Sequence, residues 1–412
     1  MKIAHVLSHI AEVHAGVPIA TCKLGCALVR LGVDISFWTT GNQDEAVSLE
    51  STGIVAHVFP RKWPQGWRYS PDLTYEFNHK ISEVDLVHIH EVWNYPQLAT
   101  AQAAIRHKIP YIWAPRASLE PWRMRYKGRK KLLYFKLLCE RIMNHAVCMH
   151  AVSDAEIEGF RQLGFCGTAV VVNNGIEPEE FRNLPDPEEA DQLWPKMKNK
   201  RVVLFLSRIS PEKGIDQLIP AWEWISKKDC YSDALLVLAG PDDRGYRRQV
   251  KEMLKRFNLT DRVLLLGMVS GRDKLALISR ADINTLPSYS EGFSNSILEN
   301  LAAAKPVLIT PGCNFPEVIS ADAGVCVEPI PEHIEEGLRR LLDMSKAELE
   351  AMGQRGMQLI HEHYTWEISA RKLITVYQAI LEGRAIPEHP VPIPIGPDGK
   401  ALLNELAKNT QS

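Results

Sequence analysis

The sequence predicts an α/β protein of two domains, each built on a parallel sheet with helices on both faces. Short apolar runs alternate with helical patterns, this alternation occurs twice, and a proline-rich acidic passage separates the two series. Continuous apolar strands interleaved with helices are typical of parallel sheets buried on both faces. Ligands of such sheets bind beyond the carboxyl ends of the strands, so we expect the two domains to face each other across a cleft.

Length and composition agree with this fold. The chain has 412 residues, which fits two domains of roughly 200 residues each. It is 45% hydrophobic and 24% charged, with a net charge of −2, and this argues against bulk nucleic-acid binding. The eight cysteines include no Cys-x-x-Cys pair, so we expect reduced thiols in a cytoplasmic protein and no metal site. The segment MKIAHVLSHIAE predicts a first strand and no secretion signal.

The first domain is predicted to span residues 1–180. Its strands are expected at Ile3 to Leu7, Ile35 to Thr39, Val55 to Phe59, Leu86 to His90, Tyr111 to Ala114, Ala146 to Val152 and Ala169 to Val172. Ser153 and Glu156 have the spacing of a capping box, which predicts a helix that starts after Ser153.

The loop after the first strand, HIAEVHAGVPIAT, places Gly16 before a helix predicted from Ile19 to Leu31. A helix N-terminus offers free N–H groups to phosphate, and glycine lets the backbone come close to it. A single glycine can equally well ease a turn, so both interpretations stay open.

Two histidines end the strand VHIHEVW. Alternate residues of a strand share a face, so His88 and His90 point the same way and Glu91 points elsewhere. Two imidazoles with no third ligand make a poor metal site, and we interpret at least one of them as packing.

Residues 116–138, RASLEPWRMRYKGRKKLLYFKLL, combine basic and apolar side chains. No acid lies between Glu120 and Glu140. Such a run is usually a solvated face. The alternative is an interfacial helix over residues 123–138 that is attracted to anionic lipid or to an anionic acceptor.

The passage NNGIEPEEFRNLPDPEE marks a linker, and the second domain is predicted to span residues 195–365. Its strands are expected at Val202 to Leu206, Leu235 to Ala239, Val263 to Leu266, Ile283 to Leu286, Val307 to Thr310 and Val325 to Glu328. The amphipathic helix in HYTWEISARKLITVYQAILEG, at about 366–383, closes the fold. Residues 384–412 are predicted to form an extended proline-rich tail without a site.

Two loops of the second domain hold the candidate site. Arg208 and Lys213 in SRISPEKG follow its first strand, where a guanidinium and an ammonium could neutralise a diphosphate. Glu291 and Glu299 in EGFSNSILE lie at a strand-to-helix turn, which suits an anionic, polyhydroxylated ligand. For Glu299, a capping box with Ser296 is the alternative that needs no ligand.

With these residues the chain resembles family 4 of the retaining glycosyltransferases, which have the GT-B fold of two Rossmann-like domains. The resemblance rests on SRISPEKG, the Glu-x7-Glu stretch EGFSNSILE, VVNNGIEPEEF, LAG followed by PDD, and HYTWEISARKLITVY, in the family's order over both halves. It implies that the first domain binds the acceptor, that the closing helix joins this domain, and that the second domain binds a nucleotide sugar.

The resemblance also implies roles for single residues. Arg208 and Lys213 would hold the donor diphosphate, Glu291 the hydroxyls of the transferred sugar, and Glu299 the ribose. The remaining donor contacts would be Val269 near the base, the backbone around Gly292, Phe293, Ser294 and Asn295, and Gly16. Glu291, Arg208 and Lys213 would serve catalysis without a metal, a cofactor or a protein nucleophile.

The sequence departs from the family at two positions. Relatives usually have Gly-Gly in the first loop, where this chain has Ala15-Gly16. Many relatives place a donor-contacting histidine at a strand end of the first domain, where APRASLEPW offers Arg116. Arg116 could bind an anionic sugar or acceptor, or substitute for that histidine toward a neutral donor. Arg116 and His90 are the candidates for contact with the acceptor or sugar.

Taken together, the sequence predicts a retaining transferase that moves a hexose from a UDP- or GDP-linked donor to a saccharide, with no nucleic-acid partner. We expect a lipid-linked oligosaccharide or polysaccharide acceptor of cell-envelope glycan synthesis, at the inner face of the cytoplasmic membrane. A nucleotide-sugar epimerase of the same fold, or a non-catalytic nucleotide-sugar-binding protein, is the alternative.

Overall fold

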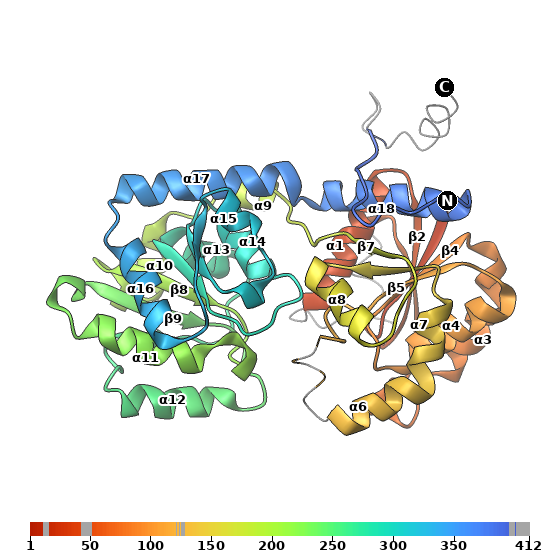
Figure 1. The fold of residues 1–412 in the computed structure, drawn as a ribbon, viewed down its shortest axis with the longest axis horizontal. Coiled ribbons are helices and arrows are strands. Elements are labelled where there is room, and N and C mark those ends of the chain that lie inside the picture. The colour runs from red at the N-terminus through yellow and green to blue at the C-terminus, as the bar shows by residue number, and fades with distance from the viewer. Residues whose placement is uncertain are drawn as a thin grey trace. The chain divides into compact units, whose positions relative to one another are not determined.

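The computed structural model describes residues 1–10, 16–42, 52–120, 122, 124, 128–394 and 400. By its internal contacts the chain forms two compact units (Figure 1). Unit 1 comprises Met1–Gly175 and Trp366–Ser412, and unit 2 comprises Ile176–Thr365. The final helix therefore belongs to the same unit as the N-terminal half of the chain.

Unit 1 is built on a seven-stranded sheet in the order β3-β2-β1-β4-β5-β6-β7, with every strand pair parallel. The strands are β1 (Lys2–Val6), β2 (Asp34–Thr40), β3 (Val55–Phe59), β4 (Leu86–His90), β5 (Tyr111–Ala114), β6 (Cys148–Ala151) and β7 (Ala169–Val171). β1, β4 and β5 lie side by side at its centre, so their carboxyl ends meet at one edge of the sheet.

Helices cover both faces of this sheet (Figure 1). They are α1 (Gly16–Arg30), α3 (Pro71–Lys80), α4 (Tyr95–His107), α6 (Gly128–Tyr134), α7 (Glu140–His145), α8 (Asp154–Gln162) and α18 (Trp366–Leu381). A π-helical segment, Phe135–Cys139, joins α6 to α7. Apolar residues of α1 and α18 share one core with the sheet, whereas α3, α4, α7 and α8 pack into a second core on the other face.

Unit 2 is built on a six-stranded parallel sheet in the order β10-β9-β8-β11-β12-β13. The strands are β8 (Arg201–Leu206), β9 (Ala234–Ala239), β10 (Val263–Leu265), β11 (Ile283–Leu286), β12 (Val307–Ile309) and β13 (Gly324–Cys326). Its helices are α9 (Glu179–Arg182), α10 (Pro187–Leu193), α11 (Ile215–Ser226), α12 (Tyr246–Arg256), α13 (Gly271–Arg280), α14 (Asn295–Ala302), α15 (Glu317–Ser320), α16 (Pro331–Leu342) and α17 (Lys346–His363).

The predicted fold class, two Rossmann-like parallel-sheet domains, is confirmed. Each predicted strand has a counterpart whose ends lie within two residues of the predicted ones. The first helix begins at Gly16 and not at Ile19. Because buried parallel strands are apolar throughout, their positions are readable from the sequence.

The predicted capping box at Ser153 and Glu156 is only half right. Ser153 is the N-cap of α8, but its side chain makes no capping hydrogen bond. The Glu156 carboxylate instead accepts from the N–H groups of Val152 at 2.8 Å and Ala117 at 2.6 Å. Glu156 thus ties α8 to the end of β5, a long-range role that local spacing does not reveal.

The tail was predicted to be extended, and residues 384–394 contain no helix or strand. This part nevertheless packs on unit 1. The Val171 N–H donates to the Glu388 carbonyl at 2.7 Å, and Ile393 is 1% exposed in the core beneath α18. Residues 395–399 and 401–412 lie outside the described residues. Within the described part of the chain, no helix is long and apolar enough to cross a bilayer.

Candidate active site

Two loops of unit 2 meet at the carboxyl ends of the neighbouring strands β8 and β11. The β8–α11 loop contains Gly214, which has φ +70° and lies so close to the second loop that a Cβ would come within 1.9 Å of the Pro287 carbonyl oxygen. Only glycine fits this contact and this conformation. The Tyr289 N–H donates to the Glu212 carbonyl at 2.9 Å and joins the same two loops. Backbone packing therefore sets the positions of the charged side chains.

This packing brings Lys213 and Glu291 together. Lys213 Nζ lies 2.5 Å from Glu291 Oε1, and the two residues are 4% and 7% exposed. The backbone of Glu291 is held as well, since its N–H donates to Gly312 and its carbonyl accepts from Asn314. A buried ion pair carries a large desolvation cost and is weak evidence for stability, so its place at the strand ends indicates a function.

Arg208 lies on the same loop as Lys213 and is more exposed. Its guanidinium contacts Glu212 at 3.0 Å and Asp243 at 3.8 Å, and 42% of the side chain is exposed. Burial opposes ionisation of Glu212, but backbone hydrogen bonding and the charges of Arg208 and Lys213 outweigh it and hold its pKa below the usual value. Two cations thus lie on one loop, each already facing a carboxylate.

Glu299 has a different environment from Glu291. It lies on α14 and pairs with Lys274 of α13 at 2.8 Å. The N-cap of α14 is Ser294, whose hydroxyl accepts from the Ile297 N–H. The alternative capping box of Ser296 and Glu299 is therefore wrong, because the helix begins two residues earlier than that motif requires.

The other predicted donor contacts surround the start of α14. Gly292, Phe293 and Ser294 are buried in the turn after Glu291, and Asn295 is the first helical residue. The Phe293 ring packs against the Phe315 and Tyr364 rings at centroid distances of 4.8 and 5.5 Å. Val269 is half-buried just before α13, the helix that carries Lys274.

A buried thiol lies next to this turn. Burial, and secondarily the Glu291 carboxylate, raises the pKa of Cys313 to about 12. Its Sγ donates to the Leu286 carbonyl at 3.1 Å. Cys313 therefore remains a protonated thiol and is a poor nucleophile.

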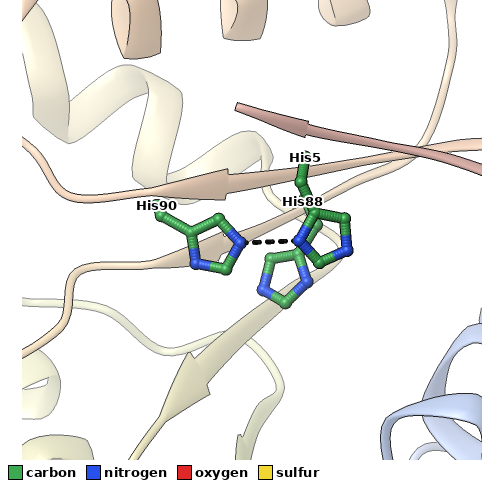
Figure 2. Close-up of side chains that lie close together, drawn as sticks. All are labelled: His5, His88 and His90. Carbon is green, nitrogen blue, oxygen red and sulfur yellow. Dashed lines mark hydrogen bonds between the residues drawn. The ribbon is translucent and has the colours of Figure 1, made fainter. Parts of the chain in front are cut away.

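In unit 1, four buried histidines form the polar centre. Figure 2 shows His5 of β1 beside His88 and His90 of β4. A continuous hydrogen-bonded chain connects His150 to His88 (3.2 Å), His88 to Tyr377 (2.7 Å), Tyr377 to His5 (3.3 Å) and His5 to His90 (3.0 Å). At its ends, His150 meets the Val172 carbonyl at 2.9 Å and His90 meets Arg116 at 3.4 Å. The hydrogen-bonded chain thus links three strands, β1, β4 and β6, to α18.

The partners at the two ends of this hydrogen-bonded chain determine which ring nitrogen of each histidine carries the proton. A carbonyl only accepts, so a neutral His150 carries its proton on Nε2 and accepts at Nδ1. His88 must then donate from Nε2 and accept from the Tyr377 hydroxyl. That hydroxyl accepts from His5 Nε2, and His5 Nδ1 accepts from His90 Nε2. His90 Nδ1 is left to accept from Arg116 Nε, which can only donate. All four imidazoles are the neutral Nε2–H tautomer.

Electrostatics agree with this assignment. Burial lowers the pKa of all four imidazoles, and the charge of Arg116 lowers them further. For His5 the pKa falls to about 3. The cluster is therefore uncharged at neutral pH.

Ring nitrogens of His5, His88 and His90 lie within 4.8 Å of one another, which is close enough for a shared metal ion. Yet each of these nitrogens already has a partner in the chain, and the Arg116 cation lies beside it. Glu91 faces elsewhere, since its carboxylate accepts from the Ser8 N–H. The contacts favour a hydrogen-bonded cluster over a metal centre, and metal-free chemistry stays a prediction.

Arg116 and Gly16 have contrasting surroundings in unit 1. Arg116 follows β5 with a left-handed backbone, φ 56°, and is 6% exposed. Its Nη1 donates to Asn174 Oδ1 at 3.1 Å. Gly16 starts α1, and a Cβ there would meet nothing within 4 Å. Ala15 lies outside the described residues.

Sequence reasoning missed several of these residues. Lys274 and His150 lie in none of the motifs. Asn174 lies in VVNNGIEPEEF and Tyr377 in HYTWEISARKLITVY, but neither was assigned to a site. His5 was visible as a polar residue within an apolar strand, and its partner strand β4 holds both other histidines. That pairing was the one available signal.

The basic apolar stretch is partly described. Arg123, Arg125 and Lys127 lie outside the described residues. On α6 and the π-helical segment, Leu132, Leu133, Leu137 and Leu138 are 48%, 61%, 70% and 39% exposed. Arg129 and Lys130 are exposed beside them. Four exposed leucines so close together are unusual for a solvated face.

Two family models match the chain. Residues 15–175 match the glycosyl transferase 4-like domain, and residues 186–358 match glycosyl transferases group 1. The chain belongs to the GT-B glycosyltransferases. The matches divide this glycosyltransferase close to the boundary at Gly175 between its two units.

Named relatives align with part of this glycosyltransferase. It is 32% identical to a D-inositol 3-phosphate glycosyltransferase of Salinispora tropica over 46% of this chain and 39% of the relative. It is 25% identical to a GDP-mannose-dependent α-(1-6)-phosphatidylinositol dimannoside mannosyltransferase of Mycobacterium tuberculosis, over 54% and 55%. The alignments thus span little more than half of these relatives at most.

Solved structures share the fold over nearly the whole chain. Anabaena HepE in complex with UDP and glucose has a TM-score of 0.71 at 19% identity, covering 93% of this chain and 99% of that one. Sucrose-phosphate synthase of Thermosynechococcus elongatus has a TM-score of 0.72 at 18% identity, covering 93% and 100%. At such identities the likeness establishes the GT-B fold of this glycosyltransferase.

Proposed function

We propose that this glycosyltransferase is an anomer-retaining, metal-independent hexosyltransferase of family 4. It takes a hexose from a UDP- or GDP-linked donor and transfers it to a saccharide acceptor, a lipid-linked oligosaccharide or polysaccharide of the cell envelope. The observation that carries the proposal is the buried pair of Lys213 and Glu291 at the carboxyl ends of β8 and β11. The relatives that use GDP-mannose and the UDP-bound structural neighbour support the donor class.

The chemistry follows from the charges at these strand ends. The acceptor hydroxyl oxygen attacks the anomeric carbon on the face from which the diphosphate leaves, and the bond from that carbon to the phosphate oxygen breaks. The hydroxyl proton passes to the departing phosphate. Lys213 and Arg208 stabilise the negative charge that develops on the diphosphate. A nucleophile on the protein is not required.

Glu291 has a double role in this proposal. An ammonium group has three N–H donors, and among the described residues Glu291 accepts from Lys213. The pair therefore aims Lys213 while leaving N–H groups for phosphate oxygens. The carboxylate also accepts hydrogen bonds from hydroxyls of the transferred sugar and so fixes the anomeric carbon. Glu299 holds the ribose in the same scheme.

Donor identity is tested by thermal shift against a panel of nucleotides and nucleotide sugars, because a ligand of the folded state raises the melting temperature. We expect stabilisation by one nucleoside diphosphate and its sugars, unchanged by EDTA. Proton NMR of the product then reports the anomeric configuration. An inverted product would contradict retention, and loss of activity with EDTA would contradict metal independence.

The lipid-linked acceptor is supported by the leucines exposed on α6 and the π-helical segment beside Arg129 and Lys130. Basic and apolar residues together favour an anionic membrane surface. We expect sedimentation with vesicles that contain anionic lipid, and loss of it in Leu133→Ser with Leu137→Ser. Val55→Ser, another exposed apolar position of unit 1, is the control. Equal binding to neutral vesicles, or none to either, removes this part of the proposal.

The two alternative functions make different predictions. An epimerase converts its nucleotide sugar when incubated without an acceptor, whereas the proposed transferase needs both substrates. A non-catalytic binding protein turns over neither. The buried Lys213–Glu291 pair favours the transferase, since a sensor has less need of groups that face the departing phosphate.

A further inference from the structure

We propose that Arg116 binds an anionic group of the substrate, a phosphate ester or a carboxylate, at the carboxyl end of β5. This inference rests on the proposed transfer reaction and narrows its substrate class. The substrate of the proposed function then carries an acidic group.

The guanidinium is incompletely paired. Nε donates to His90 and Nη1 donates to Asn174, but Nη2 is buried without a hydrogen-bond partner among the described residues. An unsatisfied buried N–H of a charged group is costly. Burial lowers the pKa of Arg116 to about 10, against the opposing effect of Glu156, so the group still carries its charge at neutral pH. A buried cation with an unused donor is suited to an anionic partner.

The hydrogen-bonded chain of histidines helps to fix the orientation of the Arg116 guanidinium. Because His90 Nδ1 is available only as an acceptor, it holds the Nε edge of the guanidinium. Asn174 holds Nη1 in the same plane. The backbone of Arg116 and Ala117 lies in the left-handed region, with φ of 56° and 61°. Residues held in this region occur preferentially at functional sites.

Further charges lie at the ends of the neighbouring strands. Arg61 and Arg68 belong to the segment between β3 and α3. Arg61 donates to the Thr40 carbonyl at the end of β2 at 2.7 Å, and Arg68 donates to the Ser8 carbonyl just after β1 at 3.4 Å. The Glu91 carboxylate follows β4, and the Glu156 carboxylate reaches the end of β5 from α8. Three guanidiniums and two carboxylates thus lie at the carboxyl ends of the adjacent strands β2, β1, β4 and β5. Ligands of parallel sheets bind at this edge, and the charge balance there favours an anion.

Two substitutions test the proposal from opposite directions. Arg116→Gln removes the cation. Asn174→Asp keeps Arg116 and places a carboxylate against Nη1, where it competes with the bound anion. Unit 1 offers a matched pair of controls, because Arg106 Nη1 donates to Asn78 Oδ1 at 3.0 Å on the exposed surface. Arg106→Gln and Asn78→Asp make the same chemical changes away from the strand ends.

The probes are methyl phosphate, glucuronate and the neutral methyl glucoside, titrated calorimetrically into the full chain with its nucleoside diphosphate at saturation. Saturation fills the diphosphate site of unit 2, so added anions report on unit 1. We expect one of the two anions to bind the unaltered chain and methyl glucoside to bind less well. The preferred anion separates a phosphorylated from a carboxylated substrate.

Loss of one charge-assisted hydrogen bond weakens the binding of a ligand roughly tenfold or more. We therefore expect both Arg116→Gln and Asn174→Asp to weaken anion binding at least about tenfold, and both controls to leave it unchanged. Unaltered stabilisation by the nucleotide shows that each variant is folded. Asn174→Asp covers the case in which Arg116→Gln does not fold, because the new carboxylate has a cation beside it.

Three results overturn the proposal: no anion binding to the unaltered chain, equal binding of methyl glucoside, or full anion binding by Asn174→Asp. Failure of the proposed function looks different. In that case no nucleoside diphosphate stabilises the chain, while anion binding that depends on Arg116 persists.

Discussion

The two units place different polar chemistry at the same position of similar sheets. In unit 1, strands β1, β4 and β6 carry neutral imidazoles whose protons all have assigned positions, and the Arg116 cation lies at one end of their hydrogen-bonded chain. In unit 2, adjacent central strands end at a buried ion pair, Lys213–Glu291, and Arg208 pairs with Glu212 on the same loop as Lys213. One centre is a network of neutral hydrogen bonds and the other is a compensated set of charges.

This difference shows what each centre can do. A neutral network with fixed tautomers holds a side chain in one orientation but produces only a weak electrostatic field. Paired charges hold cations in place, and the remaining N–H donors of these cations can bind a phosphate. We infer that unit 1 is built to position a group and unit 2 to stabilise developing charge, which fits an acceptor unit and a donor unit.

Lowering the pH is expected to give the largest difference in stability between the two units. The lowered pKa values of the four buried histidines mean that only the unfolded state takes up protons as the pH falls below about 6.5. Their contribution to stability is complete above that pH and is lost progressively below it. Burial raises the pKa of Glu156 to about 7, which opposes one histidine. Unit 1 should therefore lose up to about 4 kcal/mol per pH unit.

The measurement is the urea midpoint at pH 7.5 and pH 5.5, with pulsed hydrogen exchange at one labelling pH to assign each transition to a unit. Among the described residues, the histidines with lowered pKa values all belong to unit 1. The unit 1 transition should move to lower urea and the unit 2 transition much less. An unchanged unit 1 midpoint would show that the imidazoles are not neutral in the folded state.

Glu291→Gln should reduce kcat by about 10²–10³-fold, the effect typical of losing one preorganised electrostatic group. The substitution keeps the size of the side chain but removes the charge that aims Lys213. The bound nucleotide diphosphate then becomes the counter-charge of Lys213. We therefore expect thermal stabilisation by the nucleotide to be retained or increased. Parallel losses of transfer and nucleotide binding would reduce Glu291 to a binding residue.

Gly214→Ala tests whether backbone contact holds the charged loops of unit 2 together. The new Cβ would come within 1.9 Å of the Pro287 carbonyl oxygen at φ +70°, so we expect a loss of about 3 kcal/mol. Activity should fall as well, because Lys213 moves away from Glu291. Gly245→Ala is the control, since φ is +81° there but nothing lies within 4 Å. If urea unfolding shows that the two variants lose the same free energy of unfolding, backbone strain alone explains the effect and contact with Pro287 contributes nothing.

Tyr377→Phe removes one hydroxyl from the middle of the unit 1 chain. His88 loses a donor and His5 loses an acceptor, so we expect unit 1 to be destabilised by about 2 kcal/mol. Tyr75→Phe, at a residue that is 63% exposed, should have little effect. Urea unfolding checks both variants. An unchanged free energy of unfolding in Tyr377→Phe would show that the hydrogen-bonded chain of unit 1 is interrupted at this residue.

The fold was largely predictable because its signals are local. Apolar strand runs, glycine and proline between elements, and the amphipathic closing helix are all read within a few residues. The Lys213–Glu291 contact was anticipated from the strand-end rule and the motifs of the family. Its geometry depends on Gly214 against Pro287, which the sequence shows only as a glycine after Lys213.

The rest depends on contacts between segments far apart in sequence. Tyr377 and His88 are 289 residues apart and share a hydrogen bond of 2.7 Å. Glu156 was interpreted as a capping residue, but it bonds to the Ala117 N–H across 39 residues. Spacing alone offered Ser296 as one alternative partner of Glu299, whereas Lys274 of a neighbouring helix contacts it. Local patterns cannot rank such partners.

The central claim is that Lys213, aimed by Glu291, holds the donor diphosphate. The most direct test compares the affinity of UDP with that of uridine, and of GDP with that of guanosine, in the unaltered chain and in Lys213→Met. We predict that the diphosphate strengthens binding of the matching nucleoside at least about tenfold and that most of this gain disappears in Lys213→Met. A gain that survives the substitution would contradict the claim.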